Sequence, residues 1–440
     1  MTRLSRRAFT IGAGALAAAP LLAGCGRGND AGGDRVIVVG AGMAGLSAAR
    51  RLADAGIAVT VLEARNRIGG RTWTDSSLGL PIDLGAAWFH GTKGNPLVAL
   101  ADQIGARTVR TDFESVAVFA DGAPISAHKV DAALDGWPRV TDNLYGAADS
   151  AGPKASVGDA LTKLVDLNDP LVQWCVTSTI TAEYAADPAE LALRWFGHEG
   201  ELDGPDVLLP GGYVQLVDHL ARGLAVTLDA EVSKIAYGDH GVRVETSKGV
   251  VEGDRVIVTV PLGVLKADVI TFDPPLPEDK RRAIERLGFG LLDKVVLRFD
   301  EPFWPREPDM LGIAGKDQPV SDLVNGLRFT DTPVLVGLRG GSNARVRERQ
   351  SDEQTVQETL ATMKAPEPTG VIVTRWAADP FARGSYSFLA VGSSPDDQSA
   401  LAAPVGDRLS FAGEATHEEF FATVHGAYLS GQREAQRILG

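Results

Sequence analysis

Residues 35–49 read RVIVVGAGMAGLSAA, and this stretch decides the first part of the fold. The run from Arg35 to Val39, rich in β-branched residues, is typical of a buried parallel strand. It leads directly into a Gly40-x-Gly42-x-x-Gly45 pattern and a helix of small residues. Gly40 permits the tight turn, Gly42 lets the backbone approach a pyrophosphate, and Gly45 lets the helix pack closely on the strand. The stretch therefore predicts a Rossmann-like unit that binds a dinucleotide.

The next predicted strand supports the same interpretation. Residues 58–62 read AVTVL and end at Glu63, where such a unit places the acid that binds a ribose hydroxyl pair. A glycine pattern alone is a weak signal. A strand before it, a helix after it and an acid at the end of the next strand make the signal specific.

The residues that follow favour FAD over a nicotinamide cofactor. Residues 64–72 read ARNRIGGRT, so a second glycine pair, Gly69 and Gly70, follows the first strand–helix–strand unit. A nicotinamide enzyme has no need of this pair, whereas a bound cofactor that extends along the protein does. Arg65 and Arg71 are predicted to lie near its phosphates; the alternative for both is a solvated loop.

Composition limits the function. The chain has 440 residues, 44% of them hydrophobic, and a formal net charge of −14. An acidic protein lacks the phosphate-neutralising surface on which nucleic-acid binding depends, but it attracts cations. The length is enough for two or three domains.

The first residues are typical of an export signal. Residues 5–9 read SRRAF, a twin-arginine pattern, and residues 11–23 are apolar but too short to span a bilayer. The following LAGC at residues 22–25 resembles a lipobox with Cys25 as the lipidated residue; the alternative is an ordinary signal peptide. We expect a leader at residues 1–24, a linker at 25–33 and an exported protein, lipid-anchored in the cell envelope or released. Cys175 would then be the only other cysteine, so the mature chain would have no internal disulfide unless Cys25 stays unmodified.

Four further stretches, taken with the first, resemble the flavin-containing amine oxidases. Within that family, the WFHG and AGEATH motifs are most similar to those of polyamine oxidases. The stretches are PIDLGAAWFHG at 81–91, GFGLLDKVVL at 288–297, RWAADPFARGSYS at 375–387, and FAGEAT at 411–416 with ATVHGA at 422–427.

The resemblance implies an α/β fold with two domains. A discontinuous Rossmann-like FAD-binding domain would comprise residues 34–92, 222–272 and 400–440. An α+β substrate-binding domain with a mixed sheet would comprise residues 93–221 and 273–399. Residues 226–228 and 255–260 are strand-like, and Ser351 begins a helix-capping pattern that continues to Met363.

The resemblance also implies the reaction. Such an enzyme moves a hydride from the carbon beside an amine nitrogen to flavin N5, the imine hydrolyses, and O2 becomes H2O2. The partners would be a small-molecule amine, preferably a polyamine, and O2. Relatives with covalently attached flavin carry a cysteine where this chain has Ser385, so the FAD is predicted to be noncovalent.

The resemblance assigns catalytic roles to Lys294, Trp376, Tyr386 and His90. Lys294 would reach flavin N5 through a water; the alternative is a sheet face open to solvent. Trp376 and Tyr386 would guide the amine by cation–π attraction, or else be core aromatics. His90 would line the substrate tunnel, although a lone histidine is more often structural.

Further residues are predicted to contact cofactor or substrate. The final helix would aim the backbone N–H groups of Thr423 and Val424 at the flavin. Asp187 would provide a carboxylate for a distal ammonium, or cap a helix that begins at Pro188. The cofactor set is completed by Ala86, Trp88, Val232 and Glu414, and the substrate set by His90, Tyr386 and Thr423. No metal is expected.

Three alternatives stay open. A monoamine or L-amino-acid oxidase of the same family is the nearest, but the second would need an arginine for the carboxylate; Arg194 and Arg328 have no assigned role. A desaturase or porphyrinogen-type oxidase would share Gly69, Gly70 and Arg71, but Lys294 together with Trp376 and Tyr386 argues against it. A non-catalytic flavin-binding envelope lipoprotein would hold FAD that no amine bleaches.

Overall fold

The computed structural model describes residues 34–440, so the predicted leader, the linker and Cys25 lie outside the described residues. Within the described part, no helix has both the length and the apolar character needed to cross a bilayer.

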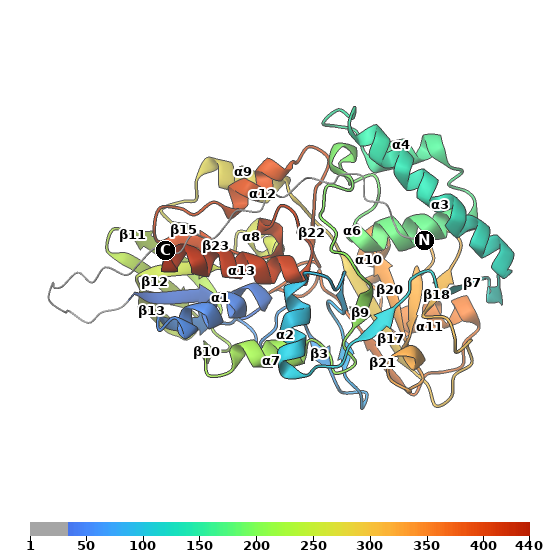
Figure 1. The fold of residues 1–440 in the computed structure, drawn as a ribbon, viewed down its shortest axis with the longest axis horizontal. Helices are drawn as coiled ribbons and strands as arrows, with labels where there is room; N and C mark the ends of the chain where they lie inside the picture. Colours follow the sequence, from blue (N-terminus) through green and yellow to red (C-terminus); the bar gives the residue numbers. More distant parts are fainter. Residues whose placement is uncertain (1–33) are drawn as a thin grey trace. The chain divides into compact units, whose positions relative to one another are not determined.

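The nucleotide-binding sheet has five parallel strands with β1 at its centre (Figure 1). Its order is β10-β2-β1-β14-β23, formed by Ala225–Thr227, Ala58–Leu62, Arg35–Val39, Arg255–Val258 and Leu409–Phe411. The strands expected at 35–39, 58–62, 226–228 and 255–260 are therefore confirmed, with ends displaced by one or two residues. Segments far apart in the chain meet here because the central strands β1 and β14 bury apolar side chains on both faces.

Helices cover one face of this sheet. Val36 and Val38 of β1 point into a core shared with α1 (Met43–Asp54), α2 (Pro96–Ile104), α7 (Val214–Ala221) and α13 (Val424–Leu439). Close approach depends on missing side chains, since a Cβ at Gly45 would lie 2.0 Å from Gly40 O and one at Gly431 would lie 2.1 Å from Ala44 O. The helix α1 is thus pressed between its own turn and the last helix.

A second sheet and three short helices cover the opposite face. Ile37 and Val39 contact this second core. The sheet has the order β13-β12-β11-β15, formed by Gly249–Gly253, Gly241–Thr246, Val232–Gly238 and Thr271–Asp273. The helices are α8 (Leu262–Lys266), α9 (Glu278–Arg286) and α12 (Pro395–Ala402).

The other large sheet has seven strands and is mixed, because β7 pairs in parallel with β18 while the other pairs are antiparallel. Its order is β21-β17-β20-β19-β18-β7-β8, formed by Gly370–Val373, Leu292–Arg298, Val334–Gly340, Asp322–Asn325, Met310–Ile313, Val116–Ala120 and Ala123–Pro124. The predicted mixed sheet is confirmed.

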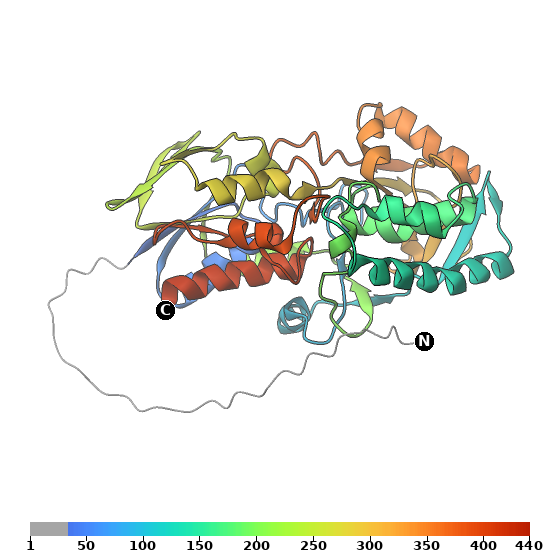
Figure 2. The ribbon, with the colours of Figure 1, turned by 90° about the horizontal axis from the view of Figure 1, so that it is seen from above.

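Helices lie on both sides of the seven-stranded sheet, and Figure 2 shows α3 and α11 on opposite sides. They are α3 (Ala127–Ala148), α4 (Val157–Leu164), α5 (Pro170–Val176), α6 (Ala182–Tyr184), α10 (Gly341–Arg347) and α11 (Asp352–Met363). One π-helical turn, Thr177–Thr181, joins α5 to α6. The capping pattern predicted at Ser351 is confirmed, because its side chain accepts from Gln354 N and Gln354 caps back.

Within the described residues, three smaller sheets carry several of the predicted site residues. They are β5-β9-β6 (Trp88–Phe89, Asp206–Leu208, Val109–Thr111), β3-β4 (Thr74–Asp75, Ile82–Asp83) and β16-β22 (Gly288–Phe289, Ser387–Phe388). The predicted α/β class is confirmed, whereas the exact domain boundaries stay predictions.

Candidate active site

The first turn of α1 forms an open cradle. Gly42 occupies the N-cap position without any side-chain cap, and a Cβ added there would find no atom closer than Gly69 O at 3.9 Å. Free N–H groups at a helix N-terminus attract a phosphate. Beside this turn the buried Glu63 carboxylate accepts from Ala41 N at 2.7 Å and Arg65 N at 2.9 Å. The arrangement fits a dinucleotide.

The second glycine pair lies against the first pattern. Gly42 and Gly69 form a parallel bridge, and Gly70 approaches Gly42 closely enough that a Cβ on it would lie 3.4 Å from the Gly42 Cα. The two glycine patterns, 27 residues apart in the chain, therefore line one space.

Both arginines predicted near the phosphates are paired with carboxylates. Arg65 Nη1 lies 2.6 Å from Asp379 Oδ2, and Arg71 Nη1 lies 2.9 Å from Glu414 Oε1. Arg71 also donates to Ser385 O at 2.7 Å. Each arginine thus joins the glycine-rich loop to a distant segment of the chain.

Glu414 is a buried connecting group. Besides Arg71, its carboxylate accepts from Ser387 Oγ at 2.6 Å and from Ala422 N at 2.9 Å. It therefore fixes the loop that leads into α13. That helix begins at Val424, and the Thr423 hydroxyl caps it by accepting from Gly426 N at 2.9 Å while donating to Phe420 O at 2.8 Å.

These residues fit FAD. Glu63 would bind the ribose, and the uncapped turn of α1 with the glycine patterns would bind the pyrophosphate. The N-terminus of α13, whose first turn holds no acid, would face a partial negative charge. Among residues 34–440 no group of three His, Cys, Asp or Glu side chains could hold a metal ion.

Lys294 is buried in β17 and binds two backbone carbonyls. Its Nζ donates to Asp83 O at 2.7 Å and to Gly85 O at 2.6 Å, and it lies 5.8 Å from the Trp88 ring centroid. Burial lowers the pKa of Lys294 to about 8, and the Asp83 carboxylate opposes that shift in part. The solvent-facing alternative is wrong, because this side chain is only 3% exposed.

Trp376 binds the backbone carbonyl of Leu84, which lies between the two carbonyls bound by Lys294. Its Nε1 donates to Leu84 O at 3.2 Å, and its ring meets Trp73 edge-on at 6.2 Å. Lys294 and Trp376 thus bind the three consecutive carbonyls of residues 83–85. We call this arrangement of the two side chains and the three carbonyls the 83–85 clamp.

Asp83, which the sequence interpretation did not single out, lies behind this clamp. Its carboxylate accepts from Thr74 Oγ1 at 2.5 Å and Tyr213 N at 3.0 Å. Burial raises the pKa of Asp83 to about 6, although the Thr74 bond and the Lys294 charge oppose it. The sequence did contain a pointer to Asp83, because the stretch 81–91 that resembles the family includes it.

Tyr386 and His90 share an acidic neighbour, Glu183. The Tyr386 hydroxyl donates to Ala182 O, and burial together with the Glu183 charge raises the pKa of Tyr386 well above its usual value. His90 Nδ1 lies 3.1 Å from Asp206 Oδ2. Desolvation lowers the pKa of the half-exposed His90 side chain, but the Asp206 bond and the Glu183 charge outweigh it and raise the pKa of His90 overall.

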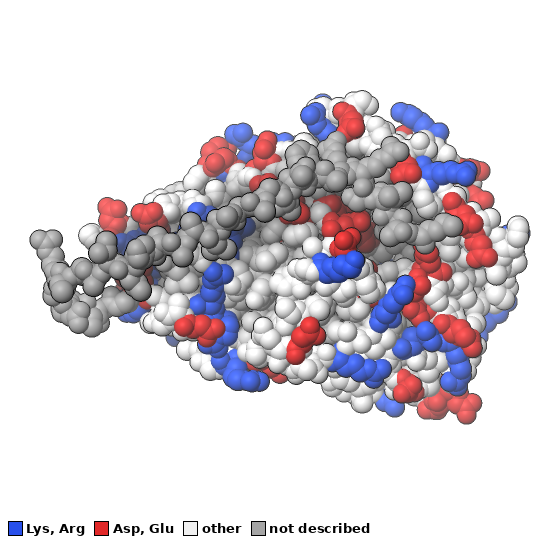
Figure 3. Space-filling view, viewed as in Figure 1, with Lys and Arg blue, Asp and Glu red and all other residues white. Residues whose placement is uncertain are grey.

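A second acid is held close to Glu183. The Tyr184 hydroxyl donates to Glu199, and burial raises the pKa of Glu199 to about 7 against that bond. Figure 3 shows acidic side chains gathered near the centre of the face it displays. Acids beside a tyrosine and a histidine suit a cationic ligand.

Asp187 has a role that neither prediction described. The segment after Pro188 is a turn, so a helix capped there is a wrong expectation. The Asp187 carboxylate instead accepts from Ser342 N at 3.1 Å, in the first turn of α10. Glu183, four residues earlier, carries the charge felt by His90 and Tyr386.

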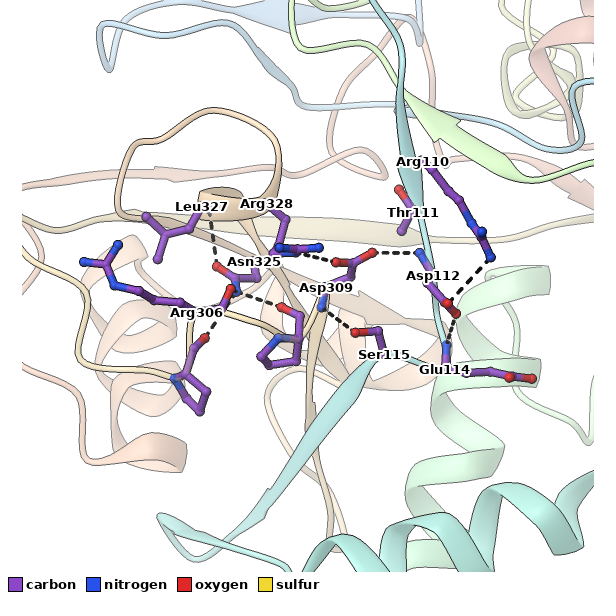
Figure 4. A network of polar contacts seen from close by, with 12 residues as sticks. Arg110, Thr111, Asp112, Glu114, Ser115, Arg306, Asp309, Asn325, Leu327 and Arg328 are labelled. Carbon is purple, nitrogen blue, oxygen red and sulfur yellow. Dashed lines mark hydrogen bonds and ion pairs between the residues drawn. The ribbon is translucent and has the colours of Figure 1, made fainter.

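The polar network of Figure 4 supports the strand behind Trp88. Trp88 Nε1 donates to Thr111 Oγ1 at 3.1 Å. Asp309 accepts from the next residue, Asp112 N, at 2.8 Å and from Arg328 Nε at 2.7 Å. Arg328, which could have bound a substrate carboxylate, is therefore engaged with Asp309.

The remaining predicted residues have simple environments. Ala86 N donates to Arg71 O at 3.2 Å. Val232 begins β11 with its side chain in the core, and the structure does not test its predicted adenine contact. Arg194 is exposed, with its guanidinium 5.4 Å from the Trp195 ring.

The fold and the site together indicate an α/β protein of the FAD-dependent oxidoreductase class. A family model described as flavin containing amine oxidoreductase matches residues 43–439. The chain belongs to this family, and it is an amine-acting oxidoreductase with FAD as its cofactor.

Individual relatives agree. Polyamine oxidase 4 from Oryza sativa subsp. japonica is 38% identical over 424 residues, covering 90% of this chain and 86% of the relative. Lysine-specific histone demethylase 1 homolog 1 from the same organism is 36% identical over 92% of this chain and 52% of the relative. A solved structure of a putrescine oxidase double mutant with redesigned cofactor binding has a TM-score of 0.78 at 24% identity, over 92% of this chain and 99% of that chain. This structural likeness shows the fold.

Proposed function

We propose that the protein oxidises amines that carry a second positive charge, with polyamines preferred. One observation carries the proposal: acids gather beside His90 and Tyr386. Asp206 Oδ2 lies 3.1 Å from His90 Nδ1, and Glu183 is near enough to both side chains for its charge to favour a higher pKa of each. A carboxylate at this point attracts an ammonium distant from the reacting carbon. A monoamine has no second charge with which to use it.

The reaction would divide the work between cofactor and protein. FAD, held by Glu63, the two glycine patterns and the first turn of α13, would supply the two-electron oxidation of the carbon beside the amine nitrogen, with O2 as final acceptor and H2O2 as its product. Trp376 and Tyr386 would orient the amine by their aromatic faces. Lys294, whose pKa is lowered by burial, would hold a water beside the reacting centre and could take or give a proton near neutral pH.

An amine panel tests the function. Purified protein is mixed anaerobically with spermidine, putrescine, tyramine, leucine or a dimethyl-lysine peptide, and bleaching of the flavin band is followed. We expect spermidine or putrescine to bleach fastest at low concentration. Fastest bleaching by leucine or tyramine would contradict the polyamine preference, and no bleaching by any amine would favour a purely binding role.

A single substitution tests the acidic subsite. Glu183→Gln should raise KM for spermidine by about tenfold, the loss of one charge contact, with a small effect on tyramine. Glu252→Gln, on an exposed position of β13, serves as the control and should change neither. Equal effects on both amines would sink the role of Glu183.

The location of the protein is a separate proposal. We infer from the twin-arginine and LAGC patterns that the chain is exported and tethered through Cys25. The full-length protein should partition into detergent with membranes, and Cys25→Ser should release it to the aqueous fraction. Identical partitioning of the two would exclude the lipid anchor.

A further inference from the structure

The 83–85 clamp rests on a carboxylate that no part of the proposed function uses. Asp293 precedes Lys294 in β17 and is fully buried. Its Oδ1 accepts from Thr374 Oγ1 at 2.8 Å and from Trp376 N at 3.0 Å. One oxygen therefore binds two points of the segment that carries Trp376.

Thr374 extends this link to Lys294. Its hydroxyl oxygen accepts from Lys294 N at 2.7 Å, and its own N–H donates to Lys294 O at 3.0 Å. The backbones of Lys294 and Trp376 are consequently joined through Asp293 and Thr374, while their side chains meet again at residues 83–85. The two connections close a loop of contacts around the clamp.

Arg339 faces Asp293 across the sheet. The two residues are register partners in β17 and β20, and Arg339 is 1% exposed. Its Nη2 lies 3.4 Å from Thr374 O and its Nη1 lies 3.5 Å from Thr355 Oγ1, while Arg339 Nε and Asp293 Oδ2 have no partner. Apolar residues commonly stabilise such a position as well as a buried ionic group does. Stability alone therefore does not explain this pair.

We propose that Asp293 is a positioning residue, which fixes Trp376 and Lys294 in the geometry that the reaction needs. The inference rests on the proposed roles of those two side chains. Displacement of a positioned group by about 1 Å can reduce a rate by about 100-fold. A carboxylate oxygen that accepts from Trp376 N directly, and from the Thr374 hydroxyl that in turn accepts from Lys294 N, is suited to prevent that displacement.

The test compares variants of the FAD-loaded enzyme. Asp293→Leu removes the accepting oxygen, and Asp293→Asn retains one. The matched control is Asp322→Leu, which removes another buried carboxylate of the same sheet, bonded to Trp174 Nε1 at 3.0 Å. Anaerobic bleaching at a series of amine concentrations gives the limiting rate and the half-saturating concentration, and the flavin absorbance spectrum is recorded before amine is added.

We expect Asp293→Leu to lower the limiting rate by about tenfold or more, to leave half-saturation nearly unchanged and to shift the flavin band. Asp293→Asn should restore most of the rate. Asp322→Leu should lose stability but keep rate and spectrum. If Asp293→Leu behaves as Asp322→Leu does, the proposal is wrong.

A double-mutant cycle separates this inference from the proposed function. If Asp293 acts through Trp376, the loss in Asp293→Leu combined with Trp376→Phe should be smaller than the sum of the two single losses. Additive losses would overturn the inference. If Trp376→Phe and Lys294→Met each keep the full rate, the proposed function fails instead, and the flavin spectrum of Asp293→Leu still decides whether the site was displaced. Should Asp293→Leu not retain FAD, Thr374→Val removes the hydroxyl that joins Asp293 to Lys294 N, leaves the bond to Trp376 N in place, and should still lower the limiting rate and shift the flavin band.

Discussion

At the residue scale, Lys294 is defined by its burial and its two carbonyl partners. We expect Lys294→Met to retain FAD and to lower the rate of flavin reduction by about 100-fold, because the amine group beside the reacting centre is removed. Stopped-flow absorbance with saturating amine measures the rate.

A second buried lysine provides a matched control. Lys280 on α9 is 1% exposed, and its Nζ donates to Ala400 O at 2.9 Å and Leu401 O at 2.6 Å near the end of α12. Lys280→Met should therefore lower stability and leave the reduction rate intact. An equal loss of rate in both variants would mean that Lys294 matters only for folding.

His425 predicts an acid sensitivity. It is buried in the first turn of α13, and its Nε2 has no hydrogen-bond partner. Burial, with smaller contributions from His90 and His417, lowers the pKa of His425 to about 4. The unfolded chain takes up a proton below about pH 6.5, and the folded protein does so only near pH 4, so stability falls as the pH drops through this window.

The expected loss from this group is about 2 kcal/mol between pH 8 and pH 5. His425→Leu should remove that part of the pH dependence, as measured by denaturant unfolding at both pH values. His240→Gln, at an exposed turn, should keep it. An unchanged pH dependence in His425→Leu would contradict the assignment.

Residue-scale sequence reasoning found segments more reliably than individual side chains. The stretch 183–188 was selected, but Asp187 caps α10 while Glu183 carries the charge near Tyr386. Both are acids in one short stretch. The choice between them depends on the π-helical turn before α6 and the left-handed Ala185 after it, which set the direction of each side chain.

At the scale of elements, the packing of α1 depends on a single missing methyl group. A Cβ at Gly45 would lie 2.0 Å from Gly40 O, so Gly45→Ala must move α1 away from β1 and open the phosphate cradle. We expect this variant to be purified with little FAD, as judged from the ratio of visible to protein absorbance.

The matched helical glycine should respond in the opposite way. Gly146 lies in α3, and a Cβ there would meet no atom within 4 Å. Gly146→Ala should keep FAD and gain about 0.5–1 kcal/mol of stability, because alanine restricts the unfolded chain. Full FAD content in Gly45→Ala would show that α1 tolerates the shift.

Elements with local signals were predictable. The strands at 35–39 and 58–62 and the helix after Ser351 were all confirmed, because hydrophobic runs and a capping box act over a few residues. The helix expected after Pro188 was wrong. There the Asp187 carboxylate accepts a hydrogen bond from Ser342 N in α10, a helix that begins more than 150 residues later.

At the scale of the whole molecule, the cofactor site joins distant parts of the chain. The predicted FAD site combines residues 40–45, 63–71 and 413–424, with Arg71 and Glu414 paired across it. Bound FAD should therefore stabilise the entire fold. A ligand at 100 times its Kd adds about 2.7 kcal/mol to the free energy of unfolding.

Removal of FAD tests this coupling. We expect the apoprotein to unfold at a lower temperature, and added FAD, but not NAD, to restore the unfolding temperature in a concentration-dependent manner. Acid denaturation should release free FAD, because Ser385 replaces the cysteine that attaches flavin in some relatives. Flavin that stays with the precipitated protein would contradict noncovalent binding.

The sequence alone determined the class of fold, the cofactor and the family, because the glycine patterns, the strand-ending acid and the separated stretches carry their meaning within short segments. Only the tertiary structure decided which groups meet. Pairing of β17 with β21 brings Lys294 beside the segment that carries Trp376, and side-chain hydrogen bonds from both residues then reach the carbonyls of residues 83–85 on another sheet. Burial also shifts the pKa values of Lys294 and Asp83, since desolvation depends on every segment packed around a group and not on its neighbours in sequence.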